Sequence, residues 1–114
     1  MRVLVCGGRD FADAALLNRT LDELHARTPI TLLIHGAARG ADSSAGRWAL
    51  RRVVPVKPFP ADWLTYKKRA GPLRNRRMLD EGRPDLVIAF PGGEGTRNMK
   101  DQARTAGVPV REIR

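Results

Sequence analysis

The chain has one cysteine in 114 residues, Cys6, and no long apolar run. A lone cysteine excludes an internal disulfide, and its place inside an apolar run predicts a small core residue in a reducing compartment. The first apolar run turns to glycine and charge after four apolar residues, far short of the roughly 20 residues of a membrane span. We therefore expect neither a signal peptide nor a membrane segment, and a cytoplasmic protein.

Aromatic and acidic residues are also scarce. Aromatic side chains make up 5% of the chain, which leaves few stacking platforms for nucleic-acid bases. Only 12 Asp and Glu stand against 21 Lys and Arg, so the formal charge is +9. This excess favours anionic partners without identifying one. The basic residues form separate clusters, and an arginine-rich surface that serves only solubility is an equal alternative; the clusters are Arg51–Arg52, Lys67–Arg69 and Arg74–Arg77.

Five short apolar runs alternate with helical patterns along the chain. The middle runs are apolar on successive residues, which is typical of parallel strands buried on both faces. Alternating strands and helices predict right-handed crossovers and a parallel sheet covered by helices on both sides. The length fits a single domain over residues 1–114. The expected strands are Arg2–Cys6, Thr31–His35, Val54–Phe59, Asp85–Phe90 and Val108–Ile113.

Amphipathic segments between these runs predict four helices. Asp13 is suited to cap the first one, which has leucines at helical spacing. The stretch Pro58–Gly71 is too long, and too rich in proline and charge, to be a plain connection. The other expected helices are Ser43–Arg52, Pro72–Leu79 and Thr96–Ala106.

Glycine is concentrated where three of the expected strands end, in the segments GGRDF (7–11), HGAARGAD (35–42) and PGGEGT (91–96). Ligands of open parallel sheets bind at the carboxyl ends of the strands, where loops lead into helix N-termini. Glycine has no Cβ and lets backbone N–H groups converge on an anion, so we expect a phosphate there. Thr96 is placed to cap the following helix or to donate its hydroxyl to that phosphate.

Tight turns that bind no ligand are the alternative interpretation of these glycine-rich segments. Three such loops at one edge of the sheet make this alternative the weaker one.

Two common nucleotide-binding motifs are absent from the sequence. The segment GEGTRN lacks the last glycine of G-x-G-x-x-G, and no Walker loop ending in Gly-Lys-Ser or Gly-Lys-Thr exists. ATP hydrolysis by a Walker mechanism is therefore not expected.

The segments GGRDF, HGAARGAD, AGPLRNRRML and PGGEGTRNM follow one another over almost the whole chain. Together they resemble the SLOG superfamily, most closely its small stand-alone members, the YspA/YpsA-related group. The resemblance implies an α/β fold of the Rossmann-like three-layer type with a five-stranded parallel sheet. It also implies a site for a nucleotide or nucleotide-derived ligand. A homodimer is expected by resemblance to the LOG phosphoribohydrolases, to which PGGEGT is similar.

Two related groups suggest other activities. HGAARGAD and RNRRM are similar to the core of the DNA-processing protein DprA, although we expect no further helical or winged domain in so short a chain. The LOG enzymes resemble this chain but carry a glutamate three positions after the motif threonine, where this chain has Met99. A thioether cannot serve as a general base. Hydrolysis of an N-glycosidic bond would need a carboxylate from another loop, such as Glu94 or Asp10.

The predicted site combines the glycines with polar residues of the same segments. Asp42 is expected to cap its helix rather than contact a ribose hydroxyl, and His35 is expected to be structural. Asn75 is expected to contact the ligand rather than to make only a structural hydrogen bond. Trp63 is expected to cover the sheet edge, which is slightly favoured over stacking on a base. No catalytic residue, metal or cofactor is predicted. The expected ligand-binding residues are Gly7, Gly8, Arg9, Gly36, Arg39, Gly40, Asp42, Arg74, Asn75, Gly92, Gly93, Glu94, Gly95 and Thr96.

The sequence thus predicts a small binding module or sensor for a nucleotide-derived molecule. The runner-up is a DprA-like protein that binds single-stranded DNA through the same arginines. A nucleotide N-glycosidase or phosphoribohydrolase is the second alternative. Salt dependence separates the first two, because binding along a phosphate backbone releases many counterions and a single mononucleotide releases few.

Overall fold

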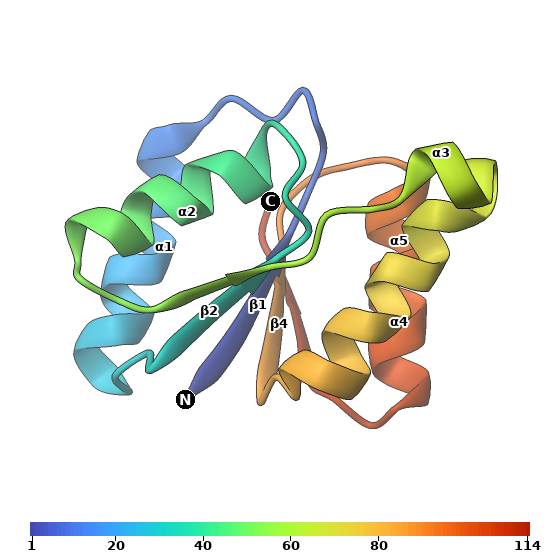
Figure 1. Cartoon of the computed structure of the whole chain (residues 1–114). Helices are drawn as coiled ribbons and strands as arrows, with labels where there is room; N and C mark the ends of the chain where they lie inside the picture. Colours follow the sequence, from blue (N-terminus) through green and yellow to red (C-terminus); the bar gives the residue numbers. More distant parts are fainter.

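Five parallel strands form the centre of the computed structural model, which describes residues 1–114 (Figure 1). They lie in the order β3-β2-β1-β4-β5, so the chain fills one side of β1 first and the other side afterwards. In such sheets the ligand crevice lies where this order reverses, here between β1 and β4. The predicted strands are confirmed, most of them a little shorter than expected: β1 (Arg2–Cys6), β2 (Leu32–His35), β3 (Val56–Pro58), β4 (Leu86–Ala89) and β5 (Val110–Glu112).

Helices cover both faces of the sheet and complete three layers, with α1 and α2 on one face and α4 and α5 on the other. In β1, Val3 and Val5 pack with α1 and α2, whereas Leu4 and Cys6 pack with α4 and α5. A strand buried on both faces has to be apolar on successive residues, as the run RVLVC is. The predicted Rossmann-like three-layer fold is thus confirmed. The covering helices are α1 (Ala14–Arg27), α2 (Ala41–Arg51), α4 (Ala70–Gly82) and α5 (Glu94–Thr105).

The helix starts differ from the prediction in a way that matters for the site. Asp13 caps α1 as expected, accepting a hydrogen bond of 3.0 Å from the N–H of Leu16. Both α2 and α5 begin two residues earlier than predicted, each directly after a glycine, Gly40 and Gly93, that offers no side-chain cap. The prediction that Thr96 caps its helix is therefore wrong, because Thr96 is already the third residue of α5.

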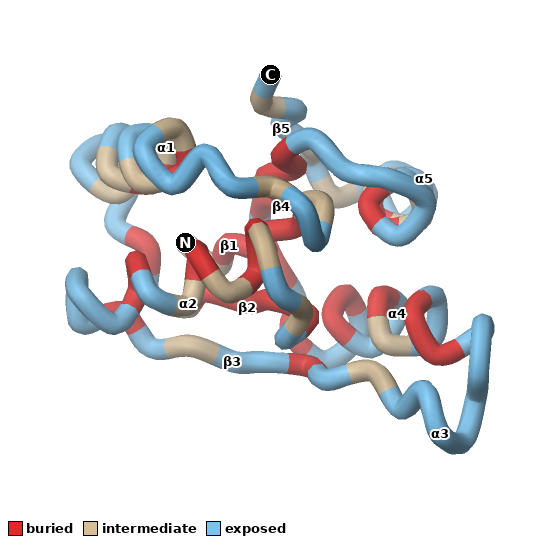
Figure 2. Tube along the Cα trace, turned by 90° about the horizontal axis from the view of Figure 1, so that it is seen from above, coloured by how far each residue is buried: buried red, intermediate tan, exposed pale blue.

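The irregular stretch forms two short helical segments, α3 (Trp63–Tyr66) and the 3₁₀ helix η1 (Lys67–Arg69), which lead directly into α4. Asp62 caps α3 through the N–H of Thr65. Figure 1 places α3 at the end of the molecule where the strands have their carboxyl ends, and Figure 2 shows it as exposed chain at the outer edge, next to α4. No helix combines the length and the apolar character that crossing a membrane requires.

Candidate functional site

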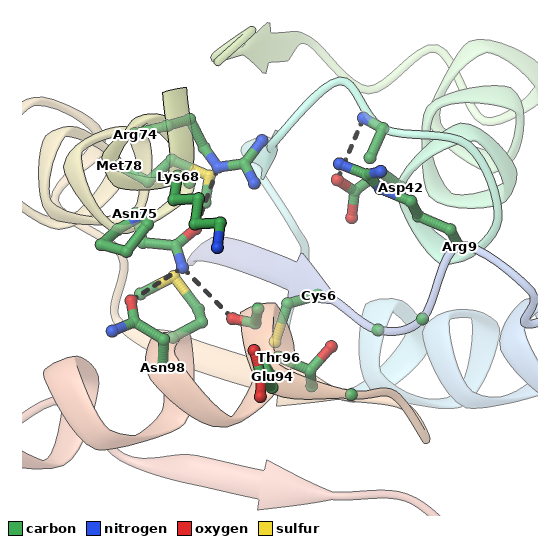
Figure 3. A pocket seen from close by; sticks show the side chains of 18 of the residues that line it. Cys6, Arg9, Asp42, Lys68, Arg74, Asn75, Met78, Glu94, Thr96 and Asn98 are labelled. Carbon is green, nitrogen blue, oxygen red and sulfur yellow. Dashed lines mark hydrogen bonds between the residues drawn. The ribbon is translucent and has the colours of Figure 1, made fainter. Parts of the chain in front are cut away.

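A pocket of about 730 Å³ opens at the carboxyl ends of β1 and β4, on the side of the sheet covered by α4 and α5. Pockets of 300 to 1,000 Å³ are the common size for small-molecule sites. Figure 3 shows side chains from both walls pointing into this space. It is lined by Cys6, Gly7, Gly8, Arg9, Ala38, Asp42, Trp63, Lys68, Gly71, Pro72, Arg74, Asn75, Met78, Gly93, Glu94, Gly95, Thr96, Asn98 and Met99.

Several of the loop glycines allow one backbone to lie against another. A Cβ on Gly8 would lie 3.1 Å from the Cα of Gly92, and a Cβ on Gly40 would lie 2.2 Å from the carbonyl oxygen of Gly8. Gly40 also has a φ of +80°, which few residues other than glycine adopt. The loops after β2, β1 and β4 therefore pack in that order against one another. This close approach explains why position 40 holds a glycine, while the predicted contact of Gly40 with the ligand stays a prediction.

Gly93 and Gly95 differ from these glycines, because a Cβ on either one would meet nothing within 4 Å. They lie at the start of α5 and line the pocket. The N–H groups of Glu94, Gly95 and Thr96 donate no hydrogen bond within the protein, as is usual for the first turn of a helix without a side-chain cap. The free N–H groups and the positive end of the helix dipole favour an anion at this position.

Thr96 lies beneath this helix start with 6% of its surface exposed. A Cβ on Gly92 would lie 2.2 Å from the Thr96 hydroxyl oxygen, so glycine at position 92 makes room for that hydroxyl. No hydrogen bond joins this hydroxyl to the rest of the protein, and since no buried side-chain oxygen lacks a partner, the hydroxyl is accessible from the pocket that Thr96 lines. It is therefore available to a ligand in the same place as the N–H groups of the first turn.

The loop after β2 is held in shape by two side chains. His35 accepts a hydrogen bond from the N–H of Ala37 through Nδ1, at 2.9 Å, and burial lowers the pKa of its imidazole. Oδ2 of Asp42 accepts hydrogen bonds from the N–H groups of Gly36 and Ala38, at 3.1 and 3.2 Å. His35 is structural, as predicted. The prediction that Asp42 caps its helix is wrong, because its carboxylate bonds to the preceding loop and α2 has no side-chain cap.

Asp42 is 6% exposed and lies in a region of positive charge, near Arg74 and Arg9. Burial raises its pKa to about 6, against the lowering effects of the loop hydrogen bond from Ala38 and of the guanidinium of Arg74. Asp42 forms no ion pair within 4 Å, and its Oδ1 accepts no hydrogen bond from the protein. Because Asp42 lines the pocket, this oxygen can accept a hydrogen bond from a ligand.

Arg74 and Asn75 on α4 connect the two walls of the pocket. Arg74 donates to the carbonyl oxygen of Gly36 through Nη1 and to Oδ1 of Asn75 through Nε, at 2.5 and 2.9 Å. A Cβ on Gly36 would lie 2.6 Å from that same Nη1, so this glycine makes room for the guanidinium. Asn75 in turn donates to Gly95 O and Asn98 Oδ1, at 3.2 and 3.1 Å (Figure 3). Asn75 is 2% exposed and uses both of its N–H groups within the protein, so it positions the start of α5.

The cations at the pocket come from three elements. The guanidinium of Arg9 lies over the ring of Trp63, 5.3 Å from its centroid, so these two side chains line one part of the opening together. Lys68 from η1 and Arg74 from α4 also line the pocket, and burial lowers the pKa of Arg74 without making it neutral. Arg39 is exposed and outside the lining.

Sulfur-containing side chains line the apolar part of the pocket. Cys6 is 7% exposed, and burial raises the pKa of its thiol to about 12, so it is neutral and a poor nucleophile. Met78 and Met99 line the same space and are almost fully buried. Of the two carboxylates considered as substitutes for a glutamate at position 99, Glu94 lines the pocket and Asp10 does not.

Most of the predicted site residues thus meet around one pocket. Four do not line it, and their places explain why: Gly36, Gly40 and Gly92 face neighbouring protein atoms, and Arg39 faces solvent. Sequence reasoning missed Lys68, Met78 and Asn98. Asn98 belongs to the quoted PGGEGTRN segment, but nothing in the sequence shows that α4 lies across from it. No three His, Cys, Asp or Glu side chains come together where they could hold a metal ion.

Comparison with known proteins agrees with this architecture. The model of the YspA, cpYpsA-related SLOG family matches residues 1–66. The chain belongs to this family. It is similar to the Gene 61 protein of Mycobacterium phage D29, with 43% identity over 118 residues that cover 96% of this chain and 93% of that protein. The predicted SLOG membership is therefore confirmed.

A solved structure with a similar fold is DNA processing protein A (DprA) from Streptococcus pneumoniae, with a TM-score of 0.81. The sequence identity is 18%, so the likeness concerns the fold. The aligned region covers 99% of this SLOG chain and 50% of the DprA chain, so this chain spans half the length of that protein.

Proposed function

We propose that this chain binds a nucleotide-derived ligand in the pocket between β1 and β4, with a phosphate of the ligand at the start of α5. The observation that carries the proposal is the open space beside Gly93 and Gly95. Glycines that serve only backbone packing have protein atoms where a Cβ would be, as Gly8 and Gly40 do. At Gly93 and Gly95 the space belongs to the pocket, and the free N–H groups of α5 border it.

Charge and size support the same ligand class. Lys68 and Arg74 line the pocket together with the start of α5, and so does Arg9, whose guanidinium lies over the ring of Trp63. Arginine and lysine are the usual partners of phosphate in addition to backbone N–H groups. The apolar lining around Met78 suits the uncharged part of such a ligand, and the volume of about 730 Å³ accommodates a mononucleotide.

A thermal-shift panel tests this proposal. AMP, ADP-ribose, NAD, cyclic nucleotides and a short single-stranded DNA are each added at low and at physiological salt. A ligand at about a hundred times its dissociation constant stabilises the fold by about 2.7 kcal/mol, which moves Tm by roughly 10 °C in a domain of this size. We expect at least one mononucleotide-sized ligand to shift Tm at both salt concentrations. A panel in which none does so contradicts the proposal.

The variant Gly93→Val locates the bound phosphate. Valine at this position has space in the empty pocket but fills the place of the phosphate. We expect a folded protein whose Tm no longer responds to the ligand. The matched control is Gly107→Ala, because Gly107 also has no atoms near a Cβ but lies at the other end of α5, away from the pocket. Equal ligand responses of wild type and Gly93→Val would place the ligand elsewhere.

A second candidate function is single-stranded DNA binding, and one specific observation favours it. Lys67, Lys68 and Arg69 follow Trp63 and Tyr66, whose exposed fractions are 46% and 49%, in the segment beside the pocket. Exposed aromatic rings among cations are typical of surfaces that stack bases and follow a phosphate backbone. Binding through this surface would fall steeply with salt, whereas binding of one mononucleotide in the pocket would fall much less.

We assign no reaction to the pocket. An N-glycosidase would need a carboxylate at the ribosyl carbon, and position 99 holds a buried methionine instead. The release of ribose 5-phosphate from any nucleotide that binds tests this alternative directly. A homodimer and a cytoplasmic location remain predictions.

A further inference from the structure

Asp42 has an oxygen for which the protein provides no partner. Asp42 is 6% exposed, and the orientation of its carboxylate is set by the two loop N–H groups that bond to Oδ2. Oδ1 accepts nothing, and neither Arg9 nor Arg74 comes within the 4 Å of an ion pair, although both affect its ionisation. No buried side-chain oxygen of the protein lacks a hydrogen-bond partner, so the unbonded Oδ1 is accessible, and the pocket that Asp42 lines is where a ligand can reach it.

The partner of this oxygen has to be a hydrogen-bond donor without negative charge. A phosphate there would be repelled by the carboxylate, so the pocket has one end for an anion, at α5, and another for a hydroxyl or amine, at Asp42. The two ends follow β4 and β2, which lie on either side of β1. The strands β4 and β2 lie two strand spacings, about 10 Å, apart.

A ribose 5-phosphate meets both requirements, because its phosphate and its ring hydroxyls lie at opposite ends of one small unit. With a hydrogen bond at each end, it spans a separation of this size. We infer that Asp42 accepts a hydrogen bond from a ribose hydroxyl of the ligand through Oδ1, so that the pocket selects ribonucleotides over their deoxy analogues. This inference rests on the proposed function, since it takes the phosphate at α5 as the other anchor.

Hydroxyl deletion in the ligand tests the inference without altering the protein. Dissociation constants of AMP, 2′-deoxy-AMP and 3′-deoxy-AMP are measured by calorimetry, with ribose 5-phosphate as a probe that has no base. We expect one of the two deoxy analogues, which lack the 2′ or the 3′ hydroxyl, to bind at least tenfold more weakly than AMP. Hydrogen bonds to a charged group are stronger than those between neutral groups. The affinity for ribose 5-phosphate should depend on the Asp42 carboxylate, whereas the affinity for inorganic phosphate should not. Equal affinities of AMP and both deoxy analogues overturn the inference.

The variant Asp42→Asn identifies the residue that makes this selection. The amide oxygen can keep the two hydrogen bonds to the loop, while the group that faces the pocket becomes an NH₂ without charge. We expect the discrimination among the three adenylates to fall below threefold, and the affinity for inorganic phosphate to stay equal or rise. Discrimination that survives in Asp42→Asn overturns the inference. Asp80→Asn removes a carboxylate from the exposed surface of α4 and is the matched control.

The failure of this inference can be told from failure of the proposed function. One outcome separates the two: AMP binds, Gly93→Val abolishes its binding, and both deoxy analogues bind as tightly as AMP. The phosphate site is then supported, and the proposed role of Asp42 is wrong. If none of the probes binds, or Gly93→Val binds AMP as well as wild type does, both are wrong. A circular dichroism spectrum and Tm of Asp42→Asn establish whether that variant is folded. If it is not, the affinities of the wild-type protein for AMP and the two deoxy analogues test the inference.

Discussion

The side-chain amide of Asn75 on α4 donates a hydrogen bond of 3.2 Å to the carbonyl oxygen of Gly95 in the first turn of α5. The same amide donates to Oδ1 of Asn98 and accepts from Nε of Arg74. Two successive helices, separated in the chain by β4, are thus fixed to each other beside the proposed phosphate position. The geometry of that position depends on a residue that need not contact the ligand itself.

Replacing Asn75 by alanine is expected to lower both stability and affinity. The substitution leaves the buried donor and acceptors around it unpaired, at a cost of about 1 to 3 kcal/mol. Chemical denaturation measures this loss, and calorimetry measures a weaker affinity for the ligand identified by the thermal-shift panel. Arg76→Ala, which removes an exposed ion pair on the same helix, should change either quantity very little. An unchanged free energy of unfolding in Asn75→Ala would show that the amide does not hold the two helices.

Replacing Gly95 by alanine is expected to move stability and affinity in opposite directions. Alanine has the higher helix propensity and meets no atom in the protein, so the fold should gain about 0.5 kcal/mol. Its methyl group faces the pocket and should weaken binding of the phosphate ligand. Gly107→Ala should instead lose about 1 kcal/mol of stability, because the φ of +77° at Gly107 disfavours a residue with a Cβ, and it should leave binding unchanged. Tighter binding by Gly95→Ala would contradict the position of the phosphate.

Replacing Gly40 by alanine is expected to damage the fold rather than a ligand contact. The added Cβ would lie 2.2 Å from the carbonyl oxygen of Gly8, in a backbone conformation that disfavours side chains. Such overlap with backbone cannot be relieved by a rotamer change, and we expect a loss of roughly 2 to 4 kcal/mol. Urea denaturation measures it. A variant with wild-type stability would show that the two loops do not pack as described.

The ionisation of Asp42 makes stability depend on pH. The pKa of Asp42 in the folded protein is about 6, above its ordinary value of 3.8, so the folded state binds this proton more tightly than the unfolded state. Stability contributed by this group is therefore greatest below pH 4 and falls as the pH rises towards 6. One pKa unit corresponds to 1.36 kcal/mol, so the ionised carboxylate costs up to about 3 kcal/mol at neutral pH.

Asp42→Asn should remove this cost. We expect the free energy of unfolding of Asp42→Asn to exceed that of wild type at pH 7. This difference between the two proteins should shrink between pH 6 and pH 4 and almost vanish below pH 4. Denaturation curves over this pH range, with Asp80→Asn as control, measure the difference. A gain of the same size at every pH would mean that the charge of Asp42 is not its source.

The order of the elements could be predicted because it depends on local patterns. Runs such as RVLVC are apolar on successive residues, and only strands covered on both faces require this. The starts of α2 and α5 could not be predicted from capping residues, since glycine precedes both helices and Thr96 lies inside the first turn. A threonine does not mark the start of α5, because the loop that ends at Gly93 positions this helix without a side-chain cap.

The glycine-rich loops could be predicted to meet at one edge, but the role of each glycine could not. Gly40 and Gly93 look alike in the sequence, and only their neighbours in space show that one packs on backbone and the other borders an open pocket. Lys68 was missed because η1 has no periodic pattern. The contact between Asn75 and Gly95 depends on the packing of α4 against α5, which no short segment specifies.

A ¹⁵N–¹H correlation spectrum, recorded while AMP is added at physiological salt, tests the phosphate site most directly. We expect the amide resonances of Glu94, Gly95 and Thr96 to shift together and saturably, because their free N–H groups bind the phosphate. Resonances of α1 should stay in place. If AMP instead shifts only residues of α3 and η1, or leaves the start of α5 unchanged at saturation, the proposed phosphate site is wrong.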